Sequence, residues 1–150
     1  MFCAGDASTA IPFTSSNTIG TTTYTWTNDT LGIGLSASGT GSIPVFTPVN
    51  NTSSPIVANI TVIPTFSNGG KSCIGPSKVF TITINPRGQV NNVSNISVCN
   101  GDTIPSVLFS TNNSGGTTTY NWTNSNTSIG LVASGSGNIA SFTATNSGNS

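Results

Sequence analysis

The sequence carries very little charge. Charged residues make up 4% of its 150 residues, with three basic and three acidic side chains and a net charge of zero. Soluble domains usually carry about 25% charged residues. Three scattered cations cannot release many counterions from a phosphate backbone, so we expect no nucleic acid partner. Serine, threonine and asparagine must therefore supply the solubility of the chain.

Histidine and glutamate are absent altogether. Most general acid-base catalysis depends on side chains of this kind, and so do the common zinc sites. We therefore expect no enzyme, no catalytic residue, no metal site and no cofactor.

Long apolar runs are also missing. No segment approaches the roughly 20 consecutive apolar residues of a membrane-spanning helix, so we expect no membrane insertion in this segment. Residues 1–4 have neither the charge nor the apolar run of a secretory signal. We expect any export signal to lie upstream of them.

What the chain does contain is a regular alternation of apolar and polar residues. Residues 80–84 alternate aromatic or aliphatic side chains with threonine, and residues 56–62 place their apolar side chains on one face. Tyr24 and Trp26 have the same parity, so both rings should face the core while the threonines between them face solvent. The turns are rich in Gly, Asn and Pro, and no helix is expected. This pattern predicts an all-β fold.

The sequence repeats itself at an offset of 96 residues. Residues 3–50 align with residues 99–146 without gaps, and 24 of the 48 aligned positions are identical. A period of this length is close to the size of an immunoglobulin-like β-sandwich. We therefore expect tandem domains, each with a core of its own.

The repeat brings the main aromatic residues into equivalent positions. Tyr24 aligns with Tyr120, and Trp26 aligns with Trp122. A tryptophan at the same place in each unit of a sandwich usually anchors the core, although an exposed ring could stack on a sugar. We predict that all four rings are core anchors.

The boundary between the two units is expected near Pro86. Proline cannot continue the hydrogen-bonded ladder of the strand before it, and a fresh alternation over residues 93–98 predicts a new strand after it. Residues 1–87 would then be a first repeat that lacks its first strand, and residues 88–150 a second repeat that lacks its last strands. Open sandwich edges leave backbone groups unpaired, so the chain is expected to be a window from a longer fibre.

Three short stretches resemble a known family of repeats. They are the segment Tyr24–Asn28, the turn Val98–Asp102 and the closing strand Val79–Pro86. Together they resemble PKD-like repeats in giant surface adhesins of gliding Bacteroidetes, and the resemblance covers both units. It implies an extracellular stalk at the cell surface, exported by the type 9 secretion system and linked to gliding motility and cell adhesion. The acidic motif that often follows the tryptophan in ordinary PKD domains is replaced here by Thr27–Asp29.

Two further motifs point to surface chemistry. The triplets 29–31 and 102–104 are similar to the Asp-Ser/Thr-aliphatic acceptor for O-glycosylation in Bacteroidetes, which makes Thr30 and Thr103 candidate sites; an unmodified turn is the alternative. Asp6 and Asp102 each follow a glycine and are expected to stabilise turns. Calcium needs about six to eight oxygen ligands, and neither aspartate has a second acid nearby in sequence.

The three cysteines are Cys3, Cys73 and Cys99, and the repeat makes Cys3 and Cys99 equivalent. A Cys3–Cys73 disulfide within a unit is the simple hypothesis, and it would suit an oxidising compartment. However, the expected topology places these two residues at opposite ends of strands roughly 23 Å long, whereas a disulfide requires Cα atoms about 4.4 to 6.8 Å apart. We therefore favour bridges between successive units.

The leading hypothesis is a structural stalk repeat of a secreted surface adhesin, whose partners are neighbouring repeats of the same polypeptide or filament. One alternative is a glycan-binding module that grips a surface polysaccharide at one pole. Another is a subunit of a self-assembling filament that completes its open domains with strands from neighbouring chains.

Overall fold

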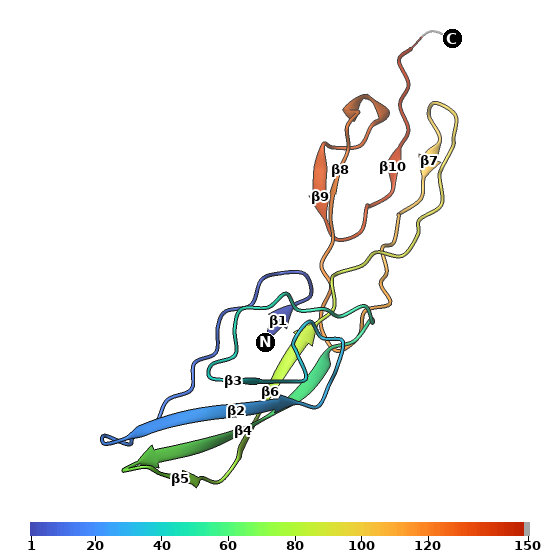
Figure 1. Ribbon diagram of the computed structural model, residues 1–150. Coiled ribbons are helices and arrows are strands. Elements are labelled where there is room, and N and C mark those ends of the chain that lie inside the picture. Colours follow the sequence, from blue (N-terminus) through green and yellow to red (C-terminus); the bar gives the residue numbers. More distant parts are fainter. Residues whose placement is uncertain (149–150) are drawn as a thin grey trace. The chain divides into compact units, whose positions relative to one another are not determined.

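The computed structural model describes residues 1–148, and they form an all-β protein (Figure 1). The only helical element in this part of the chain is a single 3-10 turn, η1 (Thr127–Ile129). The chain divides into two compact units, Met1–Arg87 and Gly88–Ser150. Within residues 1–148, no helix is both long enough and apolar enough to cross a membrane. The expected all-β class is confirmed.

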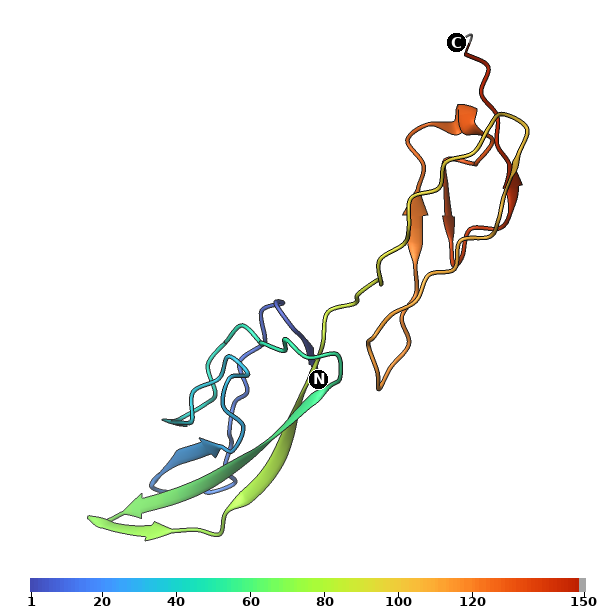
Figure 2. The ribbon, with the colours of Figure 1, turned by 90° about the vertical axis from the view of Figure 1, so that its right-hand side faces the viewer.

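Unit 1 is built on one curled sheet in which β4 is the central strand. The strand order is β1-β6-β4-β2-β3, and β5 pairs with the far end of β4. All neighbours are antiparallel except β1, which runs parallel to β6. Figure 2 shows β4 and β6 side by side over most of their length. The strands of unit 1 are β1 (Phe2–Cys3), β2 (Thr21–Asn28), β3 (Ser38–Thr40), β4 (Ile56–Asn68), β5 (Lys71–Ile74) and β6 (Lys78–Asn85).

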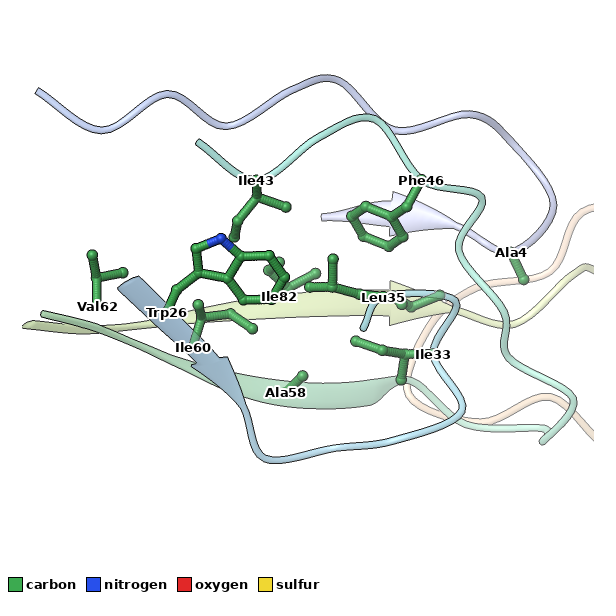
Figure 3. Close-up of a cluster of buried hydrophobic side chains, with 11 residues drawn as sticks. Ala4, Trp26, Ile33, Leu35, Ile43, Phe46, Ala58, Ile60, Val62 and Ile82 are labelled. Atoms are coloured by element: carbon green, nitrogen blue, oxygen red, sulfur yellow. The ribbon is translucent and has the colours of Figure 1, made fainter. Parts of the chain in front are cut away.

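The core of unit 1 follows the alternation of the sequence. On β4, Ala58 and Ile60 are buried, whereas Val57 and Asn59 between them are exposed. The inward side chains of β2, β4 and β6 meet apolar residues from the segment 31–50, which is irregular apart from β3, as Figure 3 shows. Burying these side chains supplies the main stabilising term of the unit. The cluster comprises Ala4, Trp26, Ile33, Leu35, Ile43, Phe46, Ala58, Ile60, Val62, Ile82 and Ile84.

Unit 2 has less regular structure. Its described residues form two separate strand pairs, β7 with β10 and β8 with β9. Ala144 is the one hydrophobic residue of this unit, within residues 88–148, that is buried. The strands are β7 (Thr103–Ile104), β8 (Asn121–Thr123), β9 (Ser134–Ser136) and β10 (Phe142–Thr143).

Several local pairings occur in both units, 96 residues apart. Trp26 pairs with Gly39 across β2 and β3, and Trp122 pairs with Gly135 across β8 and β9. An isolated bridge joins Ile11 to Ile43 in unit 1, and the matching bridge in unit 2 joins Val107 to Ile139. The residues that the sequence aligns therefore make equivalent backbone pairings in the two units.

The strand predicted over residues 93–98 does not form. Residues 88–98 are irregular, and Val93, Ile96 and Val98 are exposed. In unit 1 the residue equivalent to Val98 is Phe2, whose strand is held by pairing with β6. Among residues 88–148 no strand takes the place of β6, and a strand without a partner has no ladder to stabilise it. The prediction of a new strand in this segment is wrong for that reason.

Candidate functional site

A concave site lies in unit 1, beside the end of the sheet where β4 passes from β6 to β5. It is a groove of about 600 Å³ between the loop 12–17, the start of β2 and the segment 73–78. We call it the pole groove and define it by Phe13, Tyr24, Phe66, Lys78 and Phe80, which all line it. Its volume lies in the range of about 300 to 1,000 Å³ that is typical of small-ligand sites.

Strand register explains why these aromatic side chains meet. Tyr24 has the same parity as Trp26, so it faces inward on β2, and it lies opposite Pro64 on β4. Pro64 falls between the last residue of β4 that pairs with β6 and the first that pairs with β5. Proline has no N–H to donate to a ladder, so it suits this change of partner. Phe66 pairs with β5 beyond this change and Phe80 pairs with β4 before it, and both side chains line the groove.

The floor of the groove is a small aromatic cluster. The ring of Phe13 lies 5.6 Å from the ring of Tyr24 and 6.2 Å from the ring of Phe80, centre to centre. The hydroxyl of Tyr24 is buried, and no other described residue hydrogen-bonds to it. A buried hydroxyl without a partner is a donor and acceptor that a ligand could satisfy.

The rim of the groove is polar. The Nδ2 of Asn17 donates a hydrogen bond of 3.2 Å to the Oγ1 of Thr22, which in turn donates one of 3.3 Å to the Oγ of Ser15. Among residues 1–148, Lys78 is the one charged residue that lines the site. The arrangement therefore offers flat apolar faces for stacking, hydroxyl and amide groups for hydrogen bonds, and one cation, but no acid or base pair for catalysis.

The two tryptophans lie away from this groove. Trp26 is 3% exposed and belongs to the core of unit 1, whereas Trp122 is partly exposed. Each indole lies on a glycine: a Cβ atom placed on Gly39 would come within 2.3 Å of Trp26, and one placed on Gly135 within 2.3 Å of Trp122. Trp26 is therefore held too deeply to stack on a sugar.

Asp6 and Asp102 both lie in turns, and the carboxylate of Asp102 bonds within its own turn. The Oδ2 of Asp102 accepts a hydrogen bond of 2.9 Å from the backbone N–H of Cys99, and the N–H of Asp6 donates to the carbonyl of Cys3 at 3.3 Å. No group of three or more His, Cys, Asp or Glu side chains comes together in the described part of the chain. The third aspartate, Asp29, bonds to the neighbouring strand instead.

Asp29 forms a contact that sequence reasoning missed. Its Oδ1 accepts from the backbone N–H of Asn59 at 2.8 Å, and its Oδ2 accepts from the Asn59 Nδ2 at 2.7 Å. These bonds, together with one from the hydroxyl of Thr30, lower the pKa of the Asp29 carboxyl below its ordinary value of 3.8. The two residues are 30 positions apart, and no local pattern links them.

The candidate glycosylation sites have different surroundings. The Oγ1 of Thr30 donates a hydrogen bond of 2.8 Å to the Oδ1 of Asp29, and this side chain is partly buried. Thr103 is exposed on β7, opposite Thr143. Modification of either threonine stays a prediction, and Thr103 is the more accessible acceptor.

The three cysteines are exposed and none is in a disulfide. Cys3 pairs with Asn85 beside the first residues of β4, whereas Cys73 pairs with Phe66 near its last residues. The position along β4 that is level with Cys3 and the position that pairs with Cys73 are about eleven residues apart. This is roughly 36 Å at about 3.3 Å per residue. A disulfide between Cys3 and Cys73 within one unit is incompatible with this register, because it requires Cα atoms about 4.4 to 6.8 Å apart.

Comparison of the chain with family models, with curated proteins and with solved structures found no match. The functional argument therefore depends on the residues and geometry described above. Sequence reasoning placed Tyr24 on the correct face of its strand but did not find the pole groove. The signals that were present are the shared parity of Tyr24 and Trp26 and the identity of Phe13 with Phe109, which the 96-residue repeat aligns.

Proposed function

We propose that the chain is a structural stalk segment of a secreted cell-surface adhesin, made of tandem immunoglobulin-like, PKD-like β-sandwich repeats. The observation that carries this proposal is the recurrence of the same strand pairings 96 residues apart, with Trp26 on Gly39 and Trp122 on Gly135. A series of equivalent units provides reach and stiffness without an active site. Because the sequence resembles gliding adhesins, we also propose that the protein is exported by the type 9 secretion system and has a role in gliding motility and attachment.

The surface of the strands supports a passive role. The outward positions of β2 are Thr21, Thr23, Thr25 and Thr27, and all four are exposed. Branched residues favour extended backbone, and their hydroxyl groups keep the strand soluble without charge. The three acids of the chain are far apart in sequence and are used in turns or between strands, so we propose no enzymatic activity.

Antibody labelling tests the location and role of the protein. An antibody raised against residues 1–150 should label intact cells that produce the protein, and loss of the gene product should reduce attachment and surface spreading. Labelling that requires permeabilised cells would contradict the proposal. The purified chain should also show no concentration-dependent fibre growth, because a filament subunit would polymerise on its own.

A second candidate function is glycan binding at the pole groove of unit 1. The observation that favours it is the aromatic floor with an unpartnered Tyr24 hydroxyl, since aromatic faces and hydroxyl groups are suited to a polysaccharide. A glycan array with the full chain tests it. Glycan binding should be lost in Phe66→Ala, which removes a side chain that lines the groove, and kept in Val57→Ala, which changes an exposed residue on the same strand. This result would support the glycan-binding module. If the chain binds no glycan, the stalk is the better proposal.

A further inference from the structure

The apolar face of unit 2 is less covered than the same face of unit 1. Ile33 is 0% exposed, whereas the equivalent Ile129 is 36% exposed. Trp26 is likewise buried and Trp122 only partly so. In unit 1 the cover comes from β4 and β6, whose apolar side chains lie against this face in Figure 3. Unit 2 has no strands in the place of these two among its described residues.

One of these two strands, β4, also pairs with the edge of β2. β2 is hydrogen-bonded on one side to β3 and on the other to β4, from Thr21↔Ser67 to Asn28↔Ile60. β8, the equivalent strand of unit 2, pairs within residues 88–148 with β9 alone. Its second edge therefore presents backbone donors and acceptors that an added strand can pair with.

The surface of unit 2 that would receive these strands is made of nearly the same residues as the surface of unit 1 that β4 and β6 cover. Residues 116–124 differ from residues 20–28 at one position, where Asn121 replaces Thr25, and that residue is exposed in both units. The apolar side chains that meet β4 and β6 are also identical in the two units. The pairs are Trp26 and Trp122, Ile33 and Ile129, Leu35 and Leu131, Ile43 and Ile139, and Phe46 and Phe142.

We propose that unit 2 is a docking site for a β-hairpin of the β4–β6 type. This partner is a pair of antiparallel strands in which Ile, Val and Ala alternate with Thr and Asn, as in residues 56–85. Its first strand adds to the free edge of β8, and its apolar face covers Trp122, Ile129 and Ile139. Unit 1 defines the geometry, because it shows an almost identical acceptor strand already occupied. The proposal does not depend on where in or on the cell the protein works.

An extended chain tests the proposal with the whole protein. Residue 54 aligns with residue 150, so a copy of residues 55–87 appended after Ser150 continues the repeat in register. Amide hydrogen exchange over residues 117–124 should slow by about tenfold or more in the extended chain. In a Trp26→Phe background, the fluorescence of Trp122 should shift to shorter wavelength and become harder to quench.

Two matched variants of the appended copy identify the docking face. Changing the appended Ile60 and Ile82 to Asp places charge on the face that is buried in unit 1, whereas changing the appended Asn59 and Thr81 to Asp places the same charge on exposed positions. The first variant should lose the protection of residues 117–124, and the second should keep it.

Three results would overturn the proposal. One is unchanged exchange over residues 117–124 in the extended chain while residues 21–28 stay protected. Another is equal protection by both Asp variants, which would indicate non-specific collapse. The third is a concentration-dependent dimer of the unextended chain in which residues 117–124 are already protected, because the occupant would then be a second copy.

Discussion

The tryptophan–glycine pair is the clearest single-residue feature shared by the two units. Gly39 and Gly135 have no side chain, and each leaves the space that an indole fills. Neither glycine has a positive φ angle, so the requirement is for close approach and not for backbone freedom. The pair fixes the tryptophan against the neighbouring strand and so fixes the local register.

Removing the tryptophan should have different costs in the two units. Trp26→Ala should lower the free energy of unfolding of unit 1 by about 3 to 5 kcal/mol, since it empties a buried site. Trp122→Ala should cost less, because its ring is already partly exposed. Urea unfolding of each variant, followed by circular dichroism and by amide hydrogen exchange within the altered unit, measures both values, because the remaining tryptophan lies in the other unit. A Trp26→Ala protein that unfolds like the wild type would contradict the core assignment.

The opposite change, adding a methyl group under the indole, should also destabilise. In Gly39→Ala the new Cβ would lie 2.3 Å from Trp26, so the ring or the strand must move. We expect a loss of about 1 to 3 kcal/mol, the usual cost of overpacking a core. Thr40→Ala, at the next and exposed position, is the control and should change stability by less than about 0.5 kcal/mol.

Among the elements, β4 organises unit 1 because it pairs with three strands along its 13 residues. Its middle section holds the core, and its far end turns into β5 beside the pole groove. The contact of Asp29 with Asn59 ties the end of β2 to this strand. The strand is therefore central to the core, to the groove and to the lowered pKa of Asp29.

The Asp29 contact predicts a pH dependence of stability. The pKa of Asp29 is lowered in the folded protein, so its contribution is present above the ordinary value of 3.8 and is lost as the pH falls through the lowered value. Urea unfolding between about pH 2 and 6 should show a smaller pH dependence for Asp29→Asn than for the wild type. Asn59→Ala, which removes the strongest donor, should raise the pKa of Asp29 towards 3.8 in an NMR titration. Identical titration in both proteins would contradict the assignment.

At the scale of the whole molecule, the two units share local pairings but differ in burial. The strands β4, β5 and β6 form the part of unit 1 that has no counterpart in the described part of unit 2. Twelve hydrophobic residues are buried in the described chain, and Ala144 alone comes from unit 2. The cover supplied by the β4–β6 hairpin therefore accounts for the closed core of unit 1.

The positions of the cysteines predict how the protein oxidises. Mild oxidation should give no Cys3–Cys73 disulfide within a monomer, because the sheet register holds these residues roughly 36 Å apart along β4. Linked peptides should instead come from dimers and larger species that a reductant dissolves, since all three thiols are exposed. Mass spectrometry of the bands from a non-reducing gel measures this. A Cys3–Cys73 peptide from the monomer band would restore the simple pairing.

The sequence by itself determined the class of the fold and the faces of its strands. Alternation placed Tyr24 and Trp26 inward, and it located the apolar face of β4 over residues 56–62, because side-chain direction in a strand changes with every residue. The tertiary structure decided which alternating segments become strands and which apolar faces are covered. Residues 93–98 were predicted to form a strand but are irregular, and Asp29 meets Asn59 across the sheet. Strand formation and burial depend on a partner that lies far away in the chain, whereas the alternation pattern is local.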